Sequence, residues 1–179
     1  MFIGVCGPSG AGKDTVANIL AERLGYVHVS GGDILREMLG AAGLEPKKSA
    51  IGSFGVFIRE NYGADYLFEK VLSKGKGAKG VIVSGIRTPD EATMVKTHGG
   101  RILFVEAESK VRFDRIISRS RSSDTVSRED FDRLEVHEHS GVKGTEMNLH
   151  TVRGLADNII VNDGTIEQLK ERLNTLALQ

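Results

Sequence analysis

The chain has 179 residues, of which 40% are hydrophobic, and it carries 24 basic and 24 acidic side chains. This length fits one α/β domain and leaves little room for a second. The formal net charge of zero disfavours a dedicated nucleic-acid-binding protein, because such proteins usually carry a basic excess. The single cysteine, Cys6, cannot form an intrachain disulfide, which favours a cytosolic enzyme over a secreted scaffold.

The first residues form an uncharged run that needs to be tested as a targeting segment. Residues 1–12 contain Gly and Pro, lack a basic flank and are far shorter than the ~20 residues of a membrane span. We therefore expect no signal peptide, no transmembrane helix and a cytoplasmic location.

Strands and helices alternate along the whole sequence. Apolar runs predict strands near residues 2–6, 26–29, 81–83, 102–105 and 159–161. Helical spacing and capping signals predict helices that begin near residues 13, 31, 51, 89, 109, 128 and 166, with a break near 62–63. The strand runs are continuously apolar, as in a parallel sheet covered by helices on both faces. The pattern predicts one α/β domain over residues 1–179, with three layers (α/β/α) and a five-stranded parallel sheet.

Three helices begin with a Ser or Thr N-cap followed three residues later by an acid or an amide. These N-caps are Thr88, Ser127 and Thr165, and Pro89 adds a favourable first helical residue.

The helical phase then predicts which side chains face the core. After Ser127 we expect Phe131 and Leu134 to point inward, whereas His137-Glu138-His139 is expected on a charged surface helix. The last helix should carry one apolar stripe, formed by Ile166, Leu169, Leu173 and Leu176.

The strongest functional signal follows the first predicted strand. Residues 7–15 place two glycines five positions apart, directly before a lysine, between a strand and a helix. Glycines let backbone N–H groups curl around phosphate oxygens, and the helix directs its positive end at the same anion. Lys13 can reach the β- and γ-phosphates of ATP. The expected cofactor-binding residues of this phosphate loop are Gly7, Ser9, Gly10, Ala11, Gly12, Lys13, Asp14 and Thr15.

Asp14 occupies the position that most such loops give to a Ser or Thr whose hydroxyl binds Mg²⁺. Asp14 and Thr15 are both candidate metal ligands, directly or through water, because Mg²⁺ keeps several waters in protein sites. Asp14 is also suited to be a first-turn acid favoured by the helix dipole. The sequence allows both interpretations.

A second element, Val29-Ser30-Gly31-Gly32-Asp33-Ile34-Leu35-Arg36, follows the second predicted strand. Asp33 and Arg36 share one helix face, where the carboxylate can order metal-bound water and the guanidinium can clamp a phosphate. Here the chain resembles the nucleoside-monophosphate kinase superfamily, whose adenylate-kinase members carry a Gly-Asp-x-x-Arg element. The resemblance implies a P-loop kinase fold in which residues 30–75 bind the acceptor, with Asp33 as a further candidate metal ligand.

The resemblance continues through Val83-Ser84-Gly85-Ile86-Arg87. Superfamily members end this strand with an acid, a Gly and then an Arg that grips the acceptor phosphate, so the resemblance assigns that role to Arg87. Ser84 stands where an acid that helps to hold Mg²⁺ is expected. Either Asp33 or Asp14 supplies the missing charge, or the protein binds nucleotide and catalyses poorly.

The resemblance also implies a short lid over residues 119–127 that closes on the transferred phosphoryl group. Arg119 and Arg121 would act there as catalytic residues by spreading charge away from the transition state. Arg112 and Arg115 precede the lid and are expected on a solvated helix face.

The loop after the last predicted strand is Val161-Asn162-Asp163-Gly164-Thr165. It resembles the superfamily loop whose backbone contacts adenine, which makes Asn162 and Gly164 candidate cofactor-binding residues. The same Asn-Asp-Gly sequence is also a favourable turn.

These motifs predict a kinase that uses ATP and Mg²⁺ to phosphorylate a nucleotide-like small molecule, with a nucleoside monophosphate as the first choice. Its catalytic residues would be Lys13, Arg87, Arg119 and Arg121. The alternatives are a dephospho-CoA-kinase-like activity, a regulatory protein that binds or hydrolyses ATP, and an RNA-associated P-loop protein. We expect no nucleic-acid or membrane partner, and a monomer or homodimer.

Overall fold

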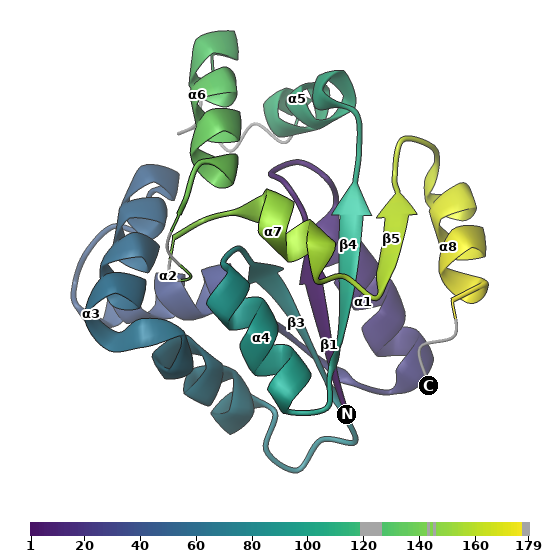
Figure 1. Cartoon of the computed structure of the whole chain (residues 1–179), viewed down its shortest axis with the longest axis horizontal. Helices are drawn as coiled ribbons and strands as arrows, with labels where there is room; N and C mark the ends of the chain where they lie inside the picture. Colours follow the sequence, from purple (N-terminus) through teal and green to yellow (C-terminus); the bar gives the residue numbers. More distant parts are fainter. Residues whose placement is uncertain (119–126, 143, 145, 177–179) are drawn as a thin grey trace.

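The computed structural model describes residues 1–118, 127–142, 144 and 146–176. Its centre is a parallel sheet of five strands in the order β2-β3-β1-β4-β5 (Figure 1). This confirms the predicted sheet. The strands are β1 (Phe2–Cys6), β2 (Val27–Ser30), β3 (Val81–Ile86), β4 (Arg101–Glu106) and β5 (Asn158–Val161).

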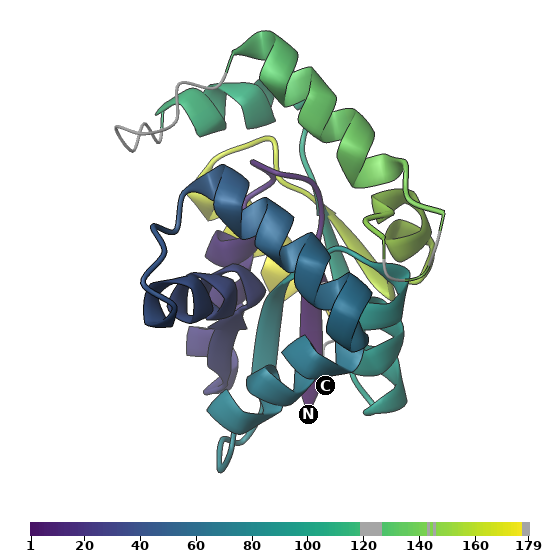
Figure 2. The ribbon, with the colours of Figure 1, turned by 90° about the vertical axis from the view of Figure 1, so that its left-hand side faces the viewer.

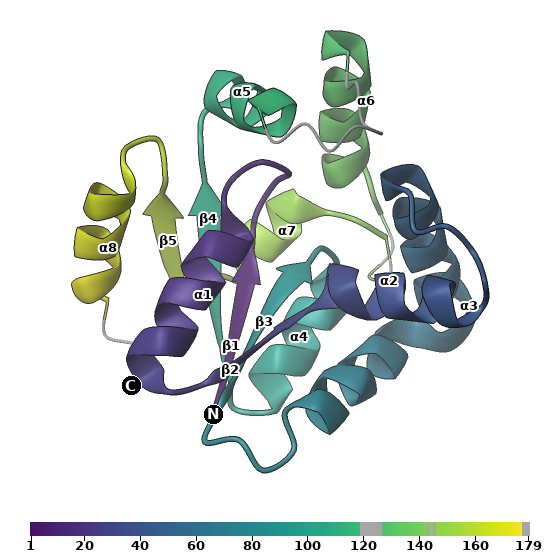
Figure 3. The ribbon, with the colours of Figure 1, turned by 180° about the vertical axis from the view of Figure 1, so that it is seen from behind.

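Helices cover both faces of the sheet, as the continuously apolar strands predict. Figure 3 shows α1 and α8 on one face, and Figure 1 shows α4 and α7 on the other. Helices α5 and α6 lie beyond the carboxyl ends of the strands (Figure 2). The helices are α1 (Lys13–Leu24), α2 (Gly31–Ala41), α3 (Lys48–Lys74), α4 (Pro89–Thr97), α5 (Ser109–Ser118), α6 (Arg128–His139), α7 (Leu149–Gly154) and α8 (Ile166–Asn174).

Two buried clusters follow from the alternation of side chains along each strand. Ile3 and Val5 of β1 point to the face covered by α1 and α8, where they join Val16, Leu20 and Leu173. The second cluster lies on the opposite face and includes residues of α2, α3, α4 and α7. Burial on both sides fixes the strands as a rigid platform for the loops that follow them.

The predicted capping boxes at Thr88, Ser127 and Thr165 are all present. The expected break in the long helix is a kink at Gly63, whose φ of 78° is left-handed.

One expectation about the C-terminal part is wrong, and one helix was not predicted. Ile166 is 42% exposed, so the predicted stripe is reduced to Leu169 and Leu173, with Leu176 partly buried against the same cluster. Helix α7 was not predicted, because its six residues are too few for a clear helical period. Its Leu149 and Val152 are nevertheless fully buried.

The carboxyl ends of β1, β2 and β3 meet at one edge of the sheet. Strand β1 has β3 on one side and β4 on the other, so the strand order changes direction at β1. Ligands of open parallel sheets bind at such a switch point. No helix in the described part of the chain is long and apolar enough to cross a membrane.

Candidate active site

The loop after β1 has the backbone conformation of an anion cradle. Gly7, Gly10 and Gly12 have φ values of 134°, 81° and 91°, a region that other residues rarely adopt. A Cβ on Gly12 would also lie 2.5 Å from the side-chain nitrogen of Asn162. Helix α1 begins directly after this turn, so its unpaired N–H groups and positive dipole end face the loop.

Lys13 closes across the loop that it terminates. Its ammonium donates a hydrogen bond to the Pro8 carbonyl over 2.8 Å. Burial, together with the neighbouring Arg87 guanidinium, lowers the pKa of Lys13 to about 8. The loop therefore concentrates positive charge that a bound anion would offset.

Side chains from outside the loop hold it in shape. The Asn162 amide, after β5, donates to the Ala11 carbonyl over 2.8 Å, and Arg112 of α5 donates to the Ser9 carbonyl over 3.3 Å. The side chain of Asn162 thus supports the phosphate loop. Arg115 donates to the Asn162 carbonyl over 2.8 Å, so this backbone carbonyl of the loop after β5 already has a hydrogen-bond donor.

The expectation of a solvated helix face at Arg112 is wrong. Arg112 is only 6% exposed, and its guanidinium is held by the Glu135 carboxylate of α6 and by the Ala107 carbonyl. The paired carboxylate offsets the charge that burial would otherwise make unfavourable.

Glu138 of α6 contacts the phosphate loop directly, and its predicted surface position is wrong. Its side chain is fully buried. One carboxylate oxygen accepts from the Ser9 hydroxyl at 2.7 Å and from the Arg87 guanidinium, and the other accepts from the Ser9 N–H at 3.1 Å. Burial raises the pKa of Glu138, but Arg87, Lys13 and Ser9 together outweigh it and lower the pKa to about 2.

Arg87 is fixed at both its main chain and its side chain. Its N–H donates to the Glu91 carboxylate over 2.9 Å, and its guanidinium pairs with Glu138. Glu91 also pairs with the buried Arg59 of α3 over 2.7 Å. A chain of charges therefore runs from α3, through the end of β3, to the phosphate loop.

The helical phase contains a signal for Glu138 and Glu135. They lie seven and four residues after Phe131, which is fully buried as predicted. Residues at these spacings share one helix face. The charged composition of the helix obscured that face, because acids are seldom buried without partners.

Asp14 and Ser84 meet between α1 and the end of β3. The Ser84 hydroxyl donates to the Asp14 carboxylate over 2.7 Å, and Nε2 of His28 lies 2.8 Å from the same hydroxyl. His28 also contacts Asn18 through Nδ1 at 2.7 Å. Burial lowers the pKa of His28. Ser84 is fully buried, whereas Asp14 is exposed.

Asp33 and Arg36 pair with each other in the first turns of α2. Their side chains are 63% and 42% exposed. Gly31, at the start of this helix, packs beside the Ser84 carbonyl, because a Cβ there would lie 3.4 Å from its oxygen. The structure thus brings the start of α2 next to the end of β3, while the predicted lid residues Arg119 and Arg121 lie outside the described residues.

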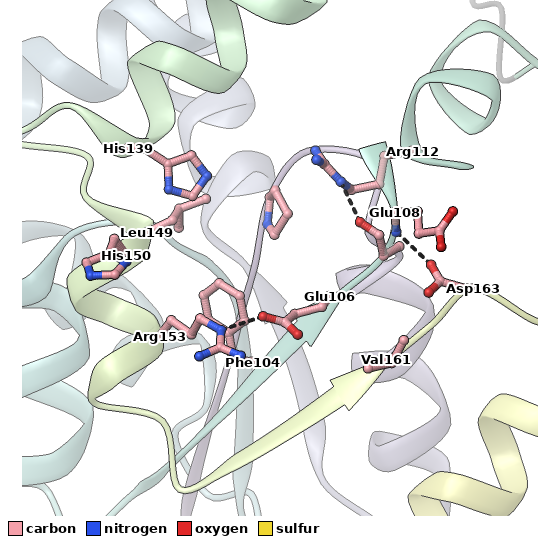
Figure 4. Close-up of a pocket in the computed structure, with 12 residues that line it drawn as sticks. Phe104, Glu106, Glu108, Arg112, His139, Leu149, His150, Arg153, Val161 and Asp163 are labelled. Carbon is pink, nitrogen blue, oxygen red and sulfur yellow. Dashed lines mark hydrogen bonds and ion pairs between the residues drawn. The ribbon is translucent and has the colours of Figure 1, made fainter. Parts of the chain in front are cut away.

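A pocket of about 370 Å³ borders the phosphate loop at Pro8 (Figure 4). Its wall includes Val161 and Asp163 from the end of β5 and its loop, and Glu106, which pairs with Arg153 of α7. Pockets of this size accommodate small molecules.

Comparisons with known proteins identify the relatives of this chain. A family model described as an AAA domain matches residues 6–132. A UPF0200 protein of Pyrobaculum aerophilum is 32% identical over 180 residues, which cover 99% of this chain and 97% of that protein.

Solved structures show the same fold at low sequence identity. A shikimate kinase from Acinetobacter baumannii, in complex with shikimate, has a TM-score of 0.64 at 18% identity and covers 99% of this chain and 92% of its own. A shikimate kinase from Bacteroides thetaiotaomicron has a TM-score of 0.65 at 15% identity, with coverage of 97% and 94%. The fold is therefore that of the P-loop kinases.

Replacing Glu138 with Gln should destabilise the fold by about 3 kcal/mol, because Arg87 loses its buried counter-charge. Urea unfolding at neutral pH measures this difference. The wild type should also lose stability as pH falls from 4.5 towards 2, since the folded-state pKa of Glu138 is depressed. The variant should lack that component. Glu129→Gln, on the exposed side of α6, is the matched control, and equal losses in both variants would contradict the assignment.

The lowered pKa of Lys13 predicts pH-dependent anion binding. ADP affinity should fall as pH rises through about 8, because the free protein then loses the ammonium that faces the phosphates. Lys13→Met should bind weakly and without this inflection. Calorimetric titrations across the range test it, and a wild-type affinity that stays constant through pH 8 contradicts it.

Proposed function

We propose that this chain, which belongs to the AAA domain family and to the UPF0200 proteins, is a kinase that transfers the γ-phosphoryl group of ATP to a small molecule. The observation that carries the proposal is the position of Arg87. Its guanidinium and the phosphate-loop residue Ser9 bind the same Glu138 carboxylate. The Glu138 carboxylate thus links the candidate acceptor-binding cation to the candidate ATP-binding loop.

The donor side of the proposed reaction uses main-chain N–H groups of residues 7–15 and the Lys13 ammonium. These groups would hold the triphosphate at the start of α1, where the helix dipole favours negative charge. No protein nucleophile is required, because positioning and charge offset supply the catalysis of phosphoryl transfer.

Mg²⁺ fits the residues at the same helix start. Carboxylate and hydroxyl oxygens are ligands that Mg²⁺ prefers, and Asp14 and Thr15 provide both types, with Asp33 on α2 as a further candidate. The described residues contain no cluster of three metal-ligating side chains. When held there by Asp14 and Thr15, Mg²⁺ would neutralise negative charge on the phosphates of ATP.

On the acceptor side, Arg87 and Arg36 would orient the substrate within the region 30–75. A guanidinium has five N–H donors, so the bond from one Arg87 nitrogen to Glu138 leaves donors for an acceptor oxygen. Glu138 would then act as a positioning residue for Arg87. Arg119 and Arg121, which lie outside the described residues, would act as catalytic residues by spreading charge away from the transition state.

A nucleoside monophosphate remains the preferred acceptor, and dephospho-CoA is the alternative. Two of the structural relatives are kinases named for shikimate, which supports a small-molecule acceptor without choosing among classes. The pocket beside Pro8 is a candidate site for the nucleoside part of ATP, because it adjoins both the phosphate loop and the loop after β5. Gly164 lies in that loop.

A second candidate is a regulatory protein that binds or hydrolyses ATP without a small acceptor. Ser84 favours it, since this residue replaces an acid that usually supports Mg²⁺. The ion pair between Arg87 and the buried Glu138 favours the kinase. Burying the Glu138 charge is costly, and its effect is to hold the Arg87 cation in position.

An acceptor screen distinguishes the two candidates. ADP production should depend on one acceptor among the nucleoside monophosphates, their deoxy forms and dephospho-CoA. Lys13→Ala should abolish ADP production while the fold survives. Lys170→Ala, which changes an exposed side chain of α8, should leave ADP production unchanged. ADP production that does not depend on any acceptor supports the ATPase. Normal turnover by Lys13→Ala overturns the assignment of the phosphate loop.

Arg87→Met should impair acceptor use far more than ATP binding, but it also strands the buried Glu138. The double variant Arg87→Met/Glu138→Gln removes that unpaired charge and should recover stability without recovering acceptor use. Steady-state kinetics with varied acceptor, together with urea unfolding, separates these effects. An unchanged acceptor KM and kcat in the double variant would rule out the proposed role of Arg87.

A further inference from the structure

We propose that Asp14 and Ser84 have exchanged the two side chains with which phosphate-loop enzymes support Mg²⁺. The inference rests on the proposed binding of Mg²⁺ and ATP. It makes Asp14 the carboxylate that contacts the metal, directly or through water, and Ser84 the buried hydroxyl that positions it.

Phosphate-loop enzymes usually place a Ser or Thr hydroxyl directly after the loop lysine and an acid at the end of a neighbouring strand. This chain has the acid after the lysine, as Asp14, and the hydroxyl near the end of β3, as Ser84. The two side chains meet in a hydrogen bond of 2.7 Å. The pair therefore contains both required groups, with their positions reversed.

The surroundings give the two members different roles. Ser84 is fully buried and its hydroxyl also contacts His28 at 2.8 Å, so it is held in place. Asp14 is exposed and uses Oδ1 for Ser84. A carboxylate has two oxygens and about four lone-pair sites, so this bond leaves capacity for a cation or its water.

Charge balance favours Asp14 over the other acids near the loop. Glu138 is paired with Arg87, and Asp33 is paired with Arg36. Asp14 bonds to the neutral Ser84 hydroxyl and interacts electrostatically with Lys13, but among the described residues its carboxylate forms no ion pair. A hard divalent cation is attracted most strongly to such a carboxylate.

The exchange also accounts for the Ser at the end of β3. A carboxylate at position 84 would lie against that of Asp14, and two adjacent carboxylates cannot both ionise without a large penalty. With the acid already on α1, a hydroxyl is the group that fits the strand. The missing acid is therefore no indication of a protein that has lost its metal site.

Reciprocal substitution tests the exchange. We would measure ATP affinity by calorimetry with and without Mg²⁺, and Mn²⁺ binding to the ADP complex by electron paramagnetic resonance. Asp14→Ser should lower the Mn²⁺ affinity by about tenfold or more and remove most of the gain that Mg²⁺ gives to ATP binding. Ser84→Asp should be destabilised. The double variant Asp14→Ser/Ser84→Asp should regain stability and metal affinity relative to both single variants.

Matched controls make each result decisive. Glu22→Ser removes another exposed acid of α1 and should bind Mn²⁺ like the wild type, whereas Asp33→Ser should lose less metal affinity than Asp14→Ser. Asp14→Asn covers the case in which the Ser84→Asp variants do not fold, and it should match the Mn²⁺ loss of Asp14→Ser. Unchanged Mn²⁺ affinity in Asp14→Ser and Asp14→Asn, or the larger loss in Asp33→Ser, overturns the exchange.

A failed exchange is distinguishable from a failed assignment of the ATP site. If the wild type binds ATP with Mg²⁺, but the Asp14 variants bind Mn²⁺ as tightly as the wild type, the exchange is wrong and the assignment of the ATP site stands. If the wild type binds no ATP, the proposed function is wrong as well.

Discussion

The buried carboxylate of Glu138 is the constraint on which the candidate site depends. It joins α6 to Ser9 of the phosphate loop and to Arg87 at the end of β3, and these partners outweigh the cost of burying its charge. Because the same carboxylate binds both the loop and the arginine, it fixes their separation. A phosphoryl-transfer site needs this kind of fixed distance between donor and acceptor groups.

The charges around this carboxylate form a connected structure. Arg59 pairs with Glu91, and Glu91 holds the backbone of Arg87. Arg112 and Asn162 hold the other side of the loop through its carbonyl groups. Buried polar groups that are all satisfied rigidify their surroundings, so these contacts hold the loop in one conformation. In the described residues, no buried side-chain nitrogen or oxygen lacks a hydrogen-bond partner.

The sequence was sufficient for the features that depend on local patterns. The glycine spacing around Lys13 located the phosphate loop, continuous apolar runs located the strands, and the cap at Thr88 located the start of α4. It was insufficient for buried charges such as Glu138 and Arg112, because their burial depends on partners far away in the chain. The bond between Asp14 and Ser84 likewise spans 70 positions and becomes visible only when β3 is placed beside β1.

The most direct test of this account is a calorimetric titration of the wild-type protein with ATP and Mg²⁺. The loop amides, the helix dipole and the Lys13 ammonium predict binding at one site, with ADP also bound. Binding should become weaker when salt is raised, because exposed charge interactions are screened. The absence of any heat with ATP and ADP, under conditions in which the protein is folded, would contradict the assignment of residues 7–15 as a nucleotide-binding loop.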